Sequence, residues 1–150
     1  MGWIYCNTMI GWLKIEEDGG FITAVELVKS VEKDNITNDI LLEAKKQIEK
    51  YFLKKRKVFD LPLKFNGTDF QKAVWNSLLR IPYGETRSYK DIAEDIKNSK
   101  ACRAVGMANN KNNIIIIVPC HRVIGKNNKL VGYACGLDIK EKLLNLEKDN

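Results

Sequence analysis

A run of β-branched residues, 114–118, leads directly into the tetrapeptide Pro119-Cys120-His121-Arg122. A run as apolar as this one is expected to be buried. The cysteine that follows it, and the only histidine of the 150 residues, are then expected to lie in the interior as well. A thiol beside an imidazole is a candidate nucleophile, because a nearby proton acceptor raises the reactive thiolate fraction. The alternative, favoured for an isolated Cys-His pair, is a buried cysteine beside an ordinary core histidine.

The spacing of apolar residues changes near residues 61–62. Upstream of this point, short apolar stretches alternate around a turn at residues 18–20, which predicts β-strands. The stretches are 3–9, 11–15 and 21–28. Apolar residues at helical spacing over residues 40–52 then predict one amphipathic helix. The first part of the chain is therefore expected to be a small sheet closed by a helix.

We expect an α+β chain of two lobes, with residues 1–62 as a supporting sheet-plus-helix lobe and residues 63–150 as a mostly helical lobe. Thr68 is expected to begin one helix of the second lobe. Residues 88–109 predict two short helices joined by a turn, with Ser88 capping the first and small residues along the second. Such a pair is typical of a helix-turn-helix DNA reader, although many helical hairpins in protein cores share the pattern.

The positive charge of the chain is concentrated in its second part. Formal net charge is +6, and residues 65–150 hold 14 basic against 9 acidic side chains. No Asp or Glu occurs from residue 96 to residue 137. A long region of one sign around a candidate nucleophile fits a polyanion such as the DNA backbone, whereas a lysine-rich solvated surface is the common alternative. The other basic run, residues 54–57, is interpreted as a solvated helix end.

Four cysteines without a secretion signal indicate free thiols in a reducing, cytoplasmic compartment. The N-terminal residues lack the basic region and cleavage site of a signal peptide. The sequence has no Cys-x-x-Cys pair and a single histidine, so we expect no metal site. No apolar stretch reaches the roughly 20 residues of a membrane span, so no membrane partner is expected.

Several motifs follow one another in the second lobe. They are Phe70-Gln71, residues 83–89 (YGETRSY), residues 103–106 (RAVG), residues 118–124 (VPCHRVI) and Gly132-Tyr133 with the sequence up to Glu147. In this order they resemble the catalytic lobe of the methylated-DNA–protein-cysteine methyltransferases, which are O6-alkylguanine-DNA alkyltransferases. Residues 1–60 fit the family's variable N-terminal lobe in general layout. The resemblance implies a ribonuclease-H-like first lobe and a winged-helix-like, DNA-binding catalytic lobe.

The resemblance also implies a reaction. Cys120 accepts the alkyl group from guanine O6 in an in-line displacement, with His121 as its base through a bridging water. Glu147 orients the histidine as the third member of a catalytic triad does, and it lies near the end of a helix that Asp138 is expected to cap. The product is a thioether that water does not cleave, so each molecule acts once. The damaged DNA is itself the alkyl donor, so no cofactor is implied.

The implied partner is double-stranded DNA that carries an alkylated guanine. The target base has to leave the stack before a buried thiol can reach it. The resemblance assigns Arg103 to fill the vacated space and Tyr89 to crowd the target phosphate and contact the flipped base. It places the second short helix in the minor groove, where small residues allow close approach to the backbone. Lys100, Ala104 and Gly106 complete the implied DNA-binding set.

The resemblance assigns a substrate pocket and a hinge as well. The pocket residues are Val123, Tyr133, Ala134, Cys135 and Lys140. Asn112 matches the hinge asparagine, but Asn113 and Ile115 stand where the family has prolines. Cys135 stands where a small or hydroxyl residue is frequent. We interpret it as a residue that narrows the pocket against bulky alkyl groups, with a purely structural cysteine as the alternative.

Two other functions stay open on these residues. A cysteine hydrolase uses the same kind of Cys-His-Glu set, but it turns over and does not need the acid-free basic region or Arg103. A non-catalytic lesion-binding relative keeps the basic surface and Tyr89 but replaces Cys120. We therefore expect a monomeric, single-turnover DNA-repair alkyltransferase, with O4-alkylthymine as a second candidate lesion.

Overall fold

The chain forms two compact units in a computed structural model. The structure describes residues 1–33, 37–126 and 129–148. The first unit comprises Met1–Phe65 together with Asn113–Ile115, and the second comprises Asn66–Asn112 and Ile116–Asn150. Among the described residues, no helix is long and apolar enough to cross a membrane. Each unit is built around elements that the apolar spacing of the sequence indicates.

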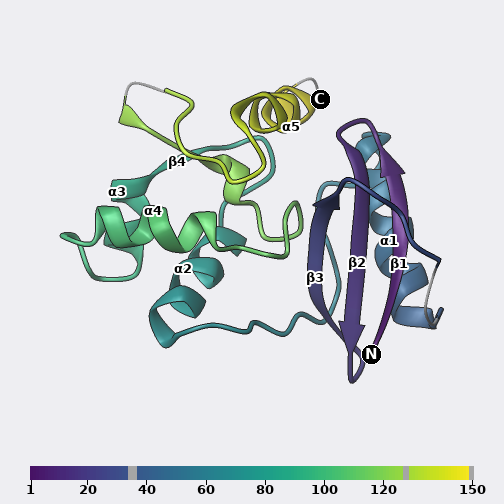
Figure 1. Cartoon of the computed structure of the whole chain (residues 1–150). Coiled ribbons are helices and arrows are strands. Elements are labelled where there is room, and N and C mark those ends of the chain that lie inside the picture. The colour runs from purple at the N-terminus through teal and green to yellow at the C-terminus, as the bar shows by residue number, and fades with distance from the viewer. Residues whose placement is uncertain (34–36, 127–128, 149–150) are drawn as a thin grey trace. The chain divides into compact units, whose positions relative to one another are not determined.

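Three antiparallel strands form the sheet of the first unit, in the order β1-β2-β3 (Figure 1). They are β1 (Gly2–Thr8), β2 (Gly11–Asp18) and β3 (Phe21–Val28). Gly19 and Gly20 form the turn between β2 and β3 with φ angles of 60° and 87°, a left-handed region that favours glycine. The Gly20 N–H donates to the Glu17 carboxylate at 3.2 Å. The predicted strands and their turn are therefore confirmed.

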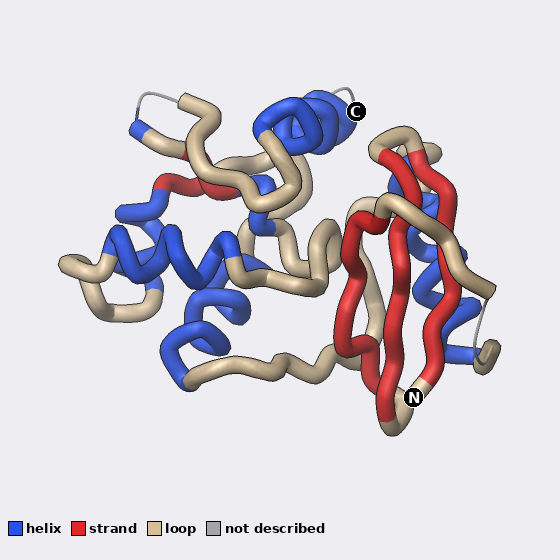
Figure 2. Tube along the Cα trace, viewed as in Figure 1, coloured by secondary structure: helices blue, strands red, loops and turns tan. Residues whose placement is uncertain are grey.

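Helix α1 (Asp39–Phe52) covers one face of this sheet (Figure 2). The Asn38 side chain caps the helix by accepting a hydrogen bond from the Leu41 N–H at 3.0 Å. The buried apolar side chains of the helix lie three or four residues apart and so share one side. They are Leu41, Ala44, Ile48 and Tyr51. This face and the sheet together form the core of the first unit.

The outer edge of β3 pairs with a segment far away in the sequence. The Val25 N–H donates to the Asn113 carbonyl at 2.8 Å, and the Val25 carbonyl accepts from the Ile115 N–H at 3.1 Å. The β-branched run is buried along its whole length, as expected. Its first residues complete the sheet of the first unit, however, and the apolar spacing gave no indication of this pairing.

The second unit is mostly helical. Its helices are α2 (Asp69–Leu79), α3 (Tyr89–Asp95), α4 (Cys102–Asn110) and α5 (Leu137–Lys148). Capping boxes begin α2 at Thr68 and α3 at Ser88, which confirms both predicted helix starts. Helix α5 begins at Leu137, so Asp138 lies in its first turn rather than at the cap, and that expectation is wrong.

A short parallel pair joins the start of α3 to the chain that follows Cys120. It consists of β4 (Arg87–Ser88) and β5 (Val123–Ile124). On the other side of Cys120, Ile116 has a φ of 74°, a left-handed conformation that β-branched residues rarely adopt. Such a conformation costs on the order of 1–3 kcal/mol and persists where the surroundings enforce it. The segment that carries the thiol is therefore tightly constrained on both sides.

Candidate active site

Cys120 lies in the interior of the second unit. It begins a single turn of 3-10 helix, η1 (Cys120–Arg122), and is 3% exposed. Two asparagines near the end of α4 hold the chain around it. The Asn109 side-chain amide donates to the Cys120 carbonyl at 3.3 Å, and that of Asn112 donates to the Val118 carbonyl at 2.9 Å. Asn112, which was predicted to be a hinge, thus connects the end of α4 to the segment that carries the thiol.

His121 and Glu147 meet in the same interior. His121 is fully buried, and its Nε2 lies 2.7 Å from Oε2 of Glu147. Glu147 comes from the last turn of α5, so a contact between residues far apart in the sequence brings the two predicted residues together. The other ring nitrogen, Nδ1, is buried and has no hydrogen-bond partner among the described residues.

Arg122 completes this cluster, and no role for it was predicted from the sequence. Its Nε and Nη2 donate to Oε1 and Oε2 of Glu147 at 2.8 and 3.0 Å, and its Nη1 donates to the Ile81 carbonyl at 2.8 Å. Two nearly parallel bonds from a planar guanidinium fix the orientation of the carboxylate. The signal for this role was present in the tetrapeptide, because an arginine next to a buried segment needs an anionic partner.

The charges of the cluster favour a neutral imidazole base. Burial acts to raise the pKa of Glu147, but the hydrogen bonds and charges of His121 and Arg122 outweigh burial and lower this pKa to about 2. Arg122 supplies the permanent charge, because a guanidinium stays protonated. Burial lowers the pKa of His121 below its ordinary value. An ionised Glu147 accepts the Nε2–H, so Nδ1 carries the lone pair that takes up a proton.

The Cys120 thiol is neutral in the DNA-free protein. Burial raises the pKa of this thiol to about 11, against the lowering effects of the Asn112 and Tyr133 side chains. Below pH 9, the fraction of Cys120 present as thiolate is therefore about 100-fold smaller than the thiolate fraction of a cysteine with the ordinary pKa of 9.0. The nucleophile thus depends on a proton acceptor when it reacts.

Iodoacetamide should therefore modify Cys120 at least about tenfold more slowly near neutral pH than it modifies the half-buried Cys102. The Cys120 rate should keep rising with pH towards 11, because each increase in pH exposes more thiolate. Mass spectrometry of the separated peptides measures both rates in one sample. Equal rates at the two cysteines near neutral pH would contradict the raised pKa of Cys120.

Tyr89 and Lys140 hold the loop that follows β5. The Tyr89 hydroxyl donates to the carbonyls of Val131 and Gly132 at 3.0 and 3.3 Å. The Lys140 ammonium donates to the same two carbonyls at 3.0 and 3.4 Å. Lys140 is fully buried, and burial lowers its pKa to about 8 although Cys120 acts in the opposite direction. This loop is therefore anchored from α3 and from α5 beside the thiol.

The predicted pocket residues occupy different environments. Val123 is fully buried in β5, directly after η1. The ring centre of Tyr133 lies 6.0 Å from the Lys140 Nζ, and the Tyr133 side chain lowers the pKa of the Cys120 thiol. Cys135 is half-buried, whereas Ala134 is exposed. Tyr133, Cys135 and Lys140 therefore share the surroundings of the thiol, and Ala134 faces solvent.

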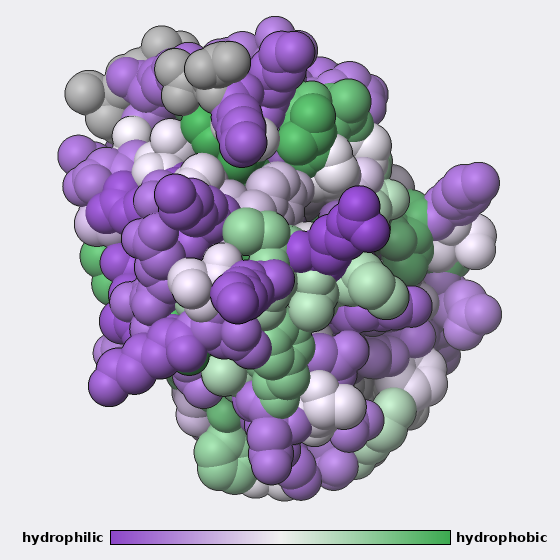
Figure 3. Space-filling view, turned by 90° about the vertical axis from the view of Figure 1, so that its left-hand side faces the viewer, coloured by the Kyte–Doolittle hydropathy of each residue, from purple (hydrophilic) through white to green (hydrophobic). Residues whose placement is uncertain are grey.

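The predicted DNA-binding residues of α4 lie at the surface. Arg103 and Ala104 are exposed on the helix, and Lys100 is exposed just before it. Gly106 packs against Tyr89, because a Cβ at this position would lie 3.7 Å from the tyrosine ring. The side of the second unit that carries α3 and α4 is mostly hydrophilic (Figure 3). A polar partner can thus reach α4 directly.

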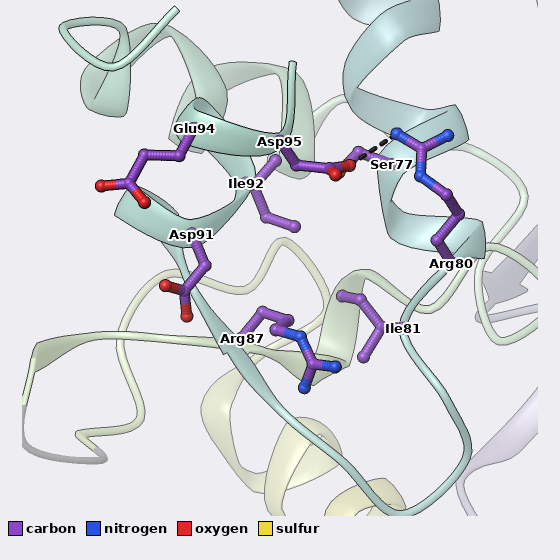
Figure 4. Close-up of a pocket in the computed structure, with 8 residues that line it drawn as sticks. All are labelled: Ser77, Arg80, Ile81, Arg87, Asp91, Ile92, Glu94 and Asp95. Carbon is purple, nitrogen blue, oxygen red and sulfur yellow. Dashed lines mark hydrogen bonds and ion pairs between the residues drawn. The ribbon is translucent and has the colours of Figure 1, made fainter. Parts of the chain in front are cut away.

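A cavity of ≈ 430 Å³ lies elsewhere in the second unit, between α2, α3 and β4 (Figure 4). Its lining residues are Ser77, Arg80, Ile81, Arg87, Asp91, Ile92, Glu94 and Asp95. Ser77 and Arg80 both donate to Oδ2 of Asp95, at 2.6 and 2.5 Å, and they lower the pKa of its carboxyl. These paired charges join α2 to α3. In the part of the chain that the structure describes, no three His, Cys, Asp or Glu residues gather as metal ligands would.

Comparisons with known proteins agree on one family. Residues 69–149 match the domain described as 6-O-methylguanine DNA methyltransferase, DNA binding domain, and residues 1–65 match the ribonuclease-like domain of the same description. The methylated-DNA–protein-cysteine methyltransferase of Methanosarcina acetivorans is 53% identical over 143 residues, which cover 95% of this chain and 83% of the relative. The constitutive one of Bacillus subtilis is 53% identical over 154 residues, with coverages of 95% and 92%.

A solved structure shares the fold as well. The crystal structure of Mycobacterium tuberculosis OGT in complex with DNA superposes with a TM-score of 0.88 at 44% identity, over 97% of this chain and 92% of that one. The fold and the buried cluster define an α+β protein whose reactive group is a cysteine. The chain belongs to the 6-O-methylguanine DNA methyltransferase family, since both domains of that family match and together span nearly all of it. The resemblance inferred from the motifs is thereby confirmed.

Proposed function

We propose that this protein repairs DNA by direct reversal, moving the alkyl group of an O6-alkylguanine in duplex DNA irreversibly onto Cys120. The observation that carries the proposal is the buried Cys120 beside the His121–Glu147–Arg122 cluster, in a chain of this family. The relatives are named for methyl transfer from DNA to a protein cysteine. The damaged DNA supplies the alkyl group, so the reaction needs no cofactor.

The chemistry is a displacement at carbon. The Cys120 sulfur forms a bond to the alkyl carbon as the bond from that carbon to guanine O6 breaks, and the guanine leaves with the electron pair. The thiol proton passes through a water to Nδ1 of His121, the ring nitrogen that does not face Glu147. The ionised Glu147 stabilises the imidazolium that forms. The leaving guanine takes up a proton, and the protein keeps a stable thioether.

We assign the approach to the DNA to α4 and Tyr89. Arg103, exposed on a helix with small neighbours, is suited to enter the minor groove and to fill the space of a flipped base. The Tyr89 hydroxyl binds the Val131 and Gly132 carbonyls in the DNA-free protein, so contact with the target nucleotide replaces these bonds. The protein works as a monomer in the cytoplasm, where reducing conditions keep Cys120 a thiol.

Intact mass measured after mixing the protein with excess duplex DNA that contains one O6-methylguanine tests the proposal. We expect a single gain of about 14 Da, located on Cys120 by peptide mapping, and no second gain at longer times. Undamaged duplex of the same sequence is the control and should leave the mass unchanged. A gain on any other residue would contradict the assignment of Cys120.

The two alternative functions predict different outcomes of the same experiment. An unchanged mass with salt-sensitive, lesion-selective binding would indicate a recognition protein with an idle thiol. An unchanged mass without selectivity for the lesion would leave the cysteine hydrolase. Either result would overturn the alkyl-transfer proposal.

A further inference from the structure

The chain that follows α2 contacts the buried Arg122–Glu147 pair at three points. The Ile81 carbonyl accepts a hydrogen bond from Nη1 of Arg122 at 2.8 Å. The ring of Tyr83 lies over Arg122, with 5.7 Å between the ring centre and the guanidinium carbon. The Gly84 N–H donates to Oε1 of Glu147 at 3.4 Å. The last two contacts bring Tyr83 and Gly84 directly against the pair.

A tight turn presents these two residues to the pair. The Glu85 N–H donates to the Pro82 carbonyl at 3.1 Å, which closes a turn of four residues. Gly84, the third residue of the turn, has a φ of 80°, whereas the φ of Tyr83 is not positive. A type II turn has this φ at its third residue and favours glycine there, because a Cβ is disfavoured in that conformation. The turn therefore fixes the backbone of Tyr83 and Gly84.

The Tyr83 ring is placed to restrain the Arg122 side chain. A guanidinium is attracted to the face of an aromatic ring when it lies within about 6 Å of the ring centre. Arg122 is 6% exposed and Tyr83 is half-buried, so water weakens the attraction little. The ring thus adds a further restraint to a guanidinium that already donates to Glu147 and Ile81.

The Gly84 N–H acts on the carboxylate of the same pair. Oε1 of Glu147 accepts this N–H and the Nε–H of Arg122, whereas Oε2 faces His121 and Arg122. A Cβ at position 84 would lie 3.4 Å from the backbone carbonyl oxygen of Glu147. Glycine therefore allows the turn to approach the end of α5 closely, and the approach gives the carboxylate one more donor.

We propose that Tyr83 and Gly84 are positioning residues for alkyl transfer. Tyr83 holds the guanidinium of Arg122. Gly84 holds the carboxylate of Glu147, which in turn holds the His121 imidazole with Nδ1 left for the incoming proton. A general base that is poorly oriented transfers protons slowly. The effect on the rate rests on the proposed function, whereas the orientation of the imidazole does not.

The single histidine of the chain allows a test that does not depend on repair. In the parent protein Glu147 accepts the Nε2–H, so NMR of the isotope-labelled ring nitrogens should show one neutral tautomer with two well-separated signals near neutral pH. Tyr83→Leu and Gly84→Ala should bring the two signals closer together, because a loosely held imidazole exchanges between its tautomers.

Transfer kinetics measure the effect on the reaction. With saturating duplex that contains one O6-methylguanine, Tyr83→Leu and Gly84→Ala should each lower the single-turnover rate at least about tenfold. Their affinity for the same duplex, measured by fluorescence anisotropy, should stay within about twofold of the parent value. A fall in affinity that accounts for the fall in rate would overturn the positioning role.

Two control variants make the test specific. Tyr83→Phe keeps the aromatic ring over the guanidinium, so it should restore the transfer rate to within about twofold of the parent value. Gly20→Ala places alanine at a φ of 87° in the turn of the first unit, where an added Cβ meets nothing within 4 Å. This variant has comparable backbone strain without the contact to Glu147, and it should transfer as the parent does.

Parent-like nitrogen signals and transfer rates in Tyr83→Leu and Gly84→Ala would overturn the proposal. A loss of rate in Tyr83→Phe as large as that in Tyr83→Leu would do so as well, because the ring would then not be the group that matters. Tyr83→Leu carries the test if Gly84→Ala does not fold. A parent protein that transfers no methyl group would contradict the proposed function, and the nitrogen signals would still decide whether the imidazole is held by this turn.

Discussion

Cys120→Ala should abolish alkyl transfer, with a fall of at least about 1,000-fold, while the duplex that contains the lesion remains bound. The alanine removes the sulfur of Cys120, the residue that directly precedes His121 of the His121–Glu147–Arg122 cluster. The exposed residues of α4, including Arg103, are untouched, so the affinity for DNA should stay within about twofold of the parent value. Transfer is read from intact mass and binding from fluorescence anisotropy at fixed salt.

Cys102→Ala is the matched control, because it removes a half-buried sulfur at the start of α4. This variant should transfer the methyl group with the parent stoichiometry. Methyl transfer that persists in Cys120→Ala, with the methyl group found on Cys135, would show that the loop thiol is the acceptor. That outcome would overturn both the assignment of Cys120 and the mechanism through His121.

Glu147→Ala should lower the free energy of unfolding by about 3–5 kcal/mol, the largest loss of stability that we expect from one substitution. The change removes the carboxylate that pairs with Arg122 and leaves a guanidinium buried without its charge partner. Urea unfolding at neutral pH measures the loss. Glu141→Ala, at an exposed position of the same helix, is the control and should stay within about 0.5 kcal/mol of the parent.

The same carboxylate should give the stability a defined dependence on pH. The pKa of Glu147 is lowered from 4.5 to about 2, so its contribution is complete above pH 4.5 and is lost as the pH falls towards 2. Glu147→Gln should remove most of this acid sensitivity, because the amide does not titrate. A parent protein whose stability does not change between these pH values would contradict the pairing of Glu147 with Arg122.

The sequence predicted those elements whose local signals agree with their environment. A strand with one buried face alternates apolar and polar residues, and β2 follows that rule, with Leu13 and Ile15 buried on either side of Lys14. Helices α2 and α3 begin at Thr68 and Ser88 because side-chain caps are local interactions. The contact between His121 and Glu147 was predicted from the family motifs, because the spacing of the two residues in the sequence does not indicate it. Local signals therefore carried the elements, and the family motifs carried the site.

The features that escaped prediction depend on contacts between distant residues. Nothing in the apolar run indicates that the backbones of Asn113 and Ile115 pair with Val25. A continuous apolar run predicts that a segment is buried, but it does not predict which strand the segment pairs with. In the sequence, Arg122 is only the last residue of a motif. Its role depends on its hydrogen bond to Glu147, a residue of α5 that is distant in the sequence. Asn109 was predicted only as the last residue of the second short helix, and its hydrogen bond to the Cys120 carbonyl depends on the chain that follows α4.

The return of the chain to Val25 has a consequence for how this family can be recombined. An exchange cassette, meaning an N-terminal fragment that ends at residue 65, would leave the backbone N–H and C=O of Val25 without the partners that Asn113 and Ile115 provide. Such a cassette would present an open strand edge, which invites association with other chains. Exchange of N-terminal halves between relatives therefore transplants an incomplete sheet unless the few residues before Ile116 travel with it. Modules defined by continuous sequence and modules defined by hydrogen bonding do not coincide in this protein.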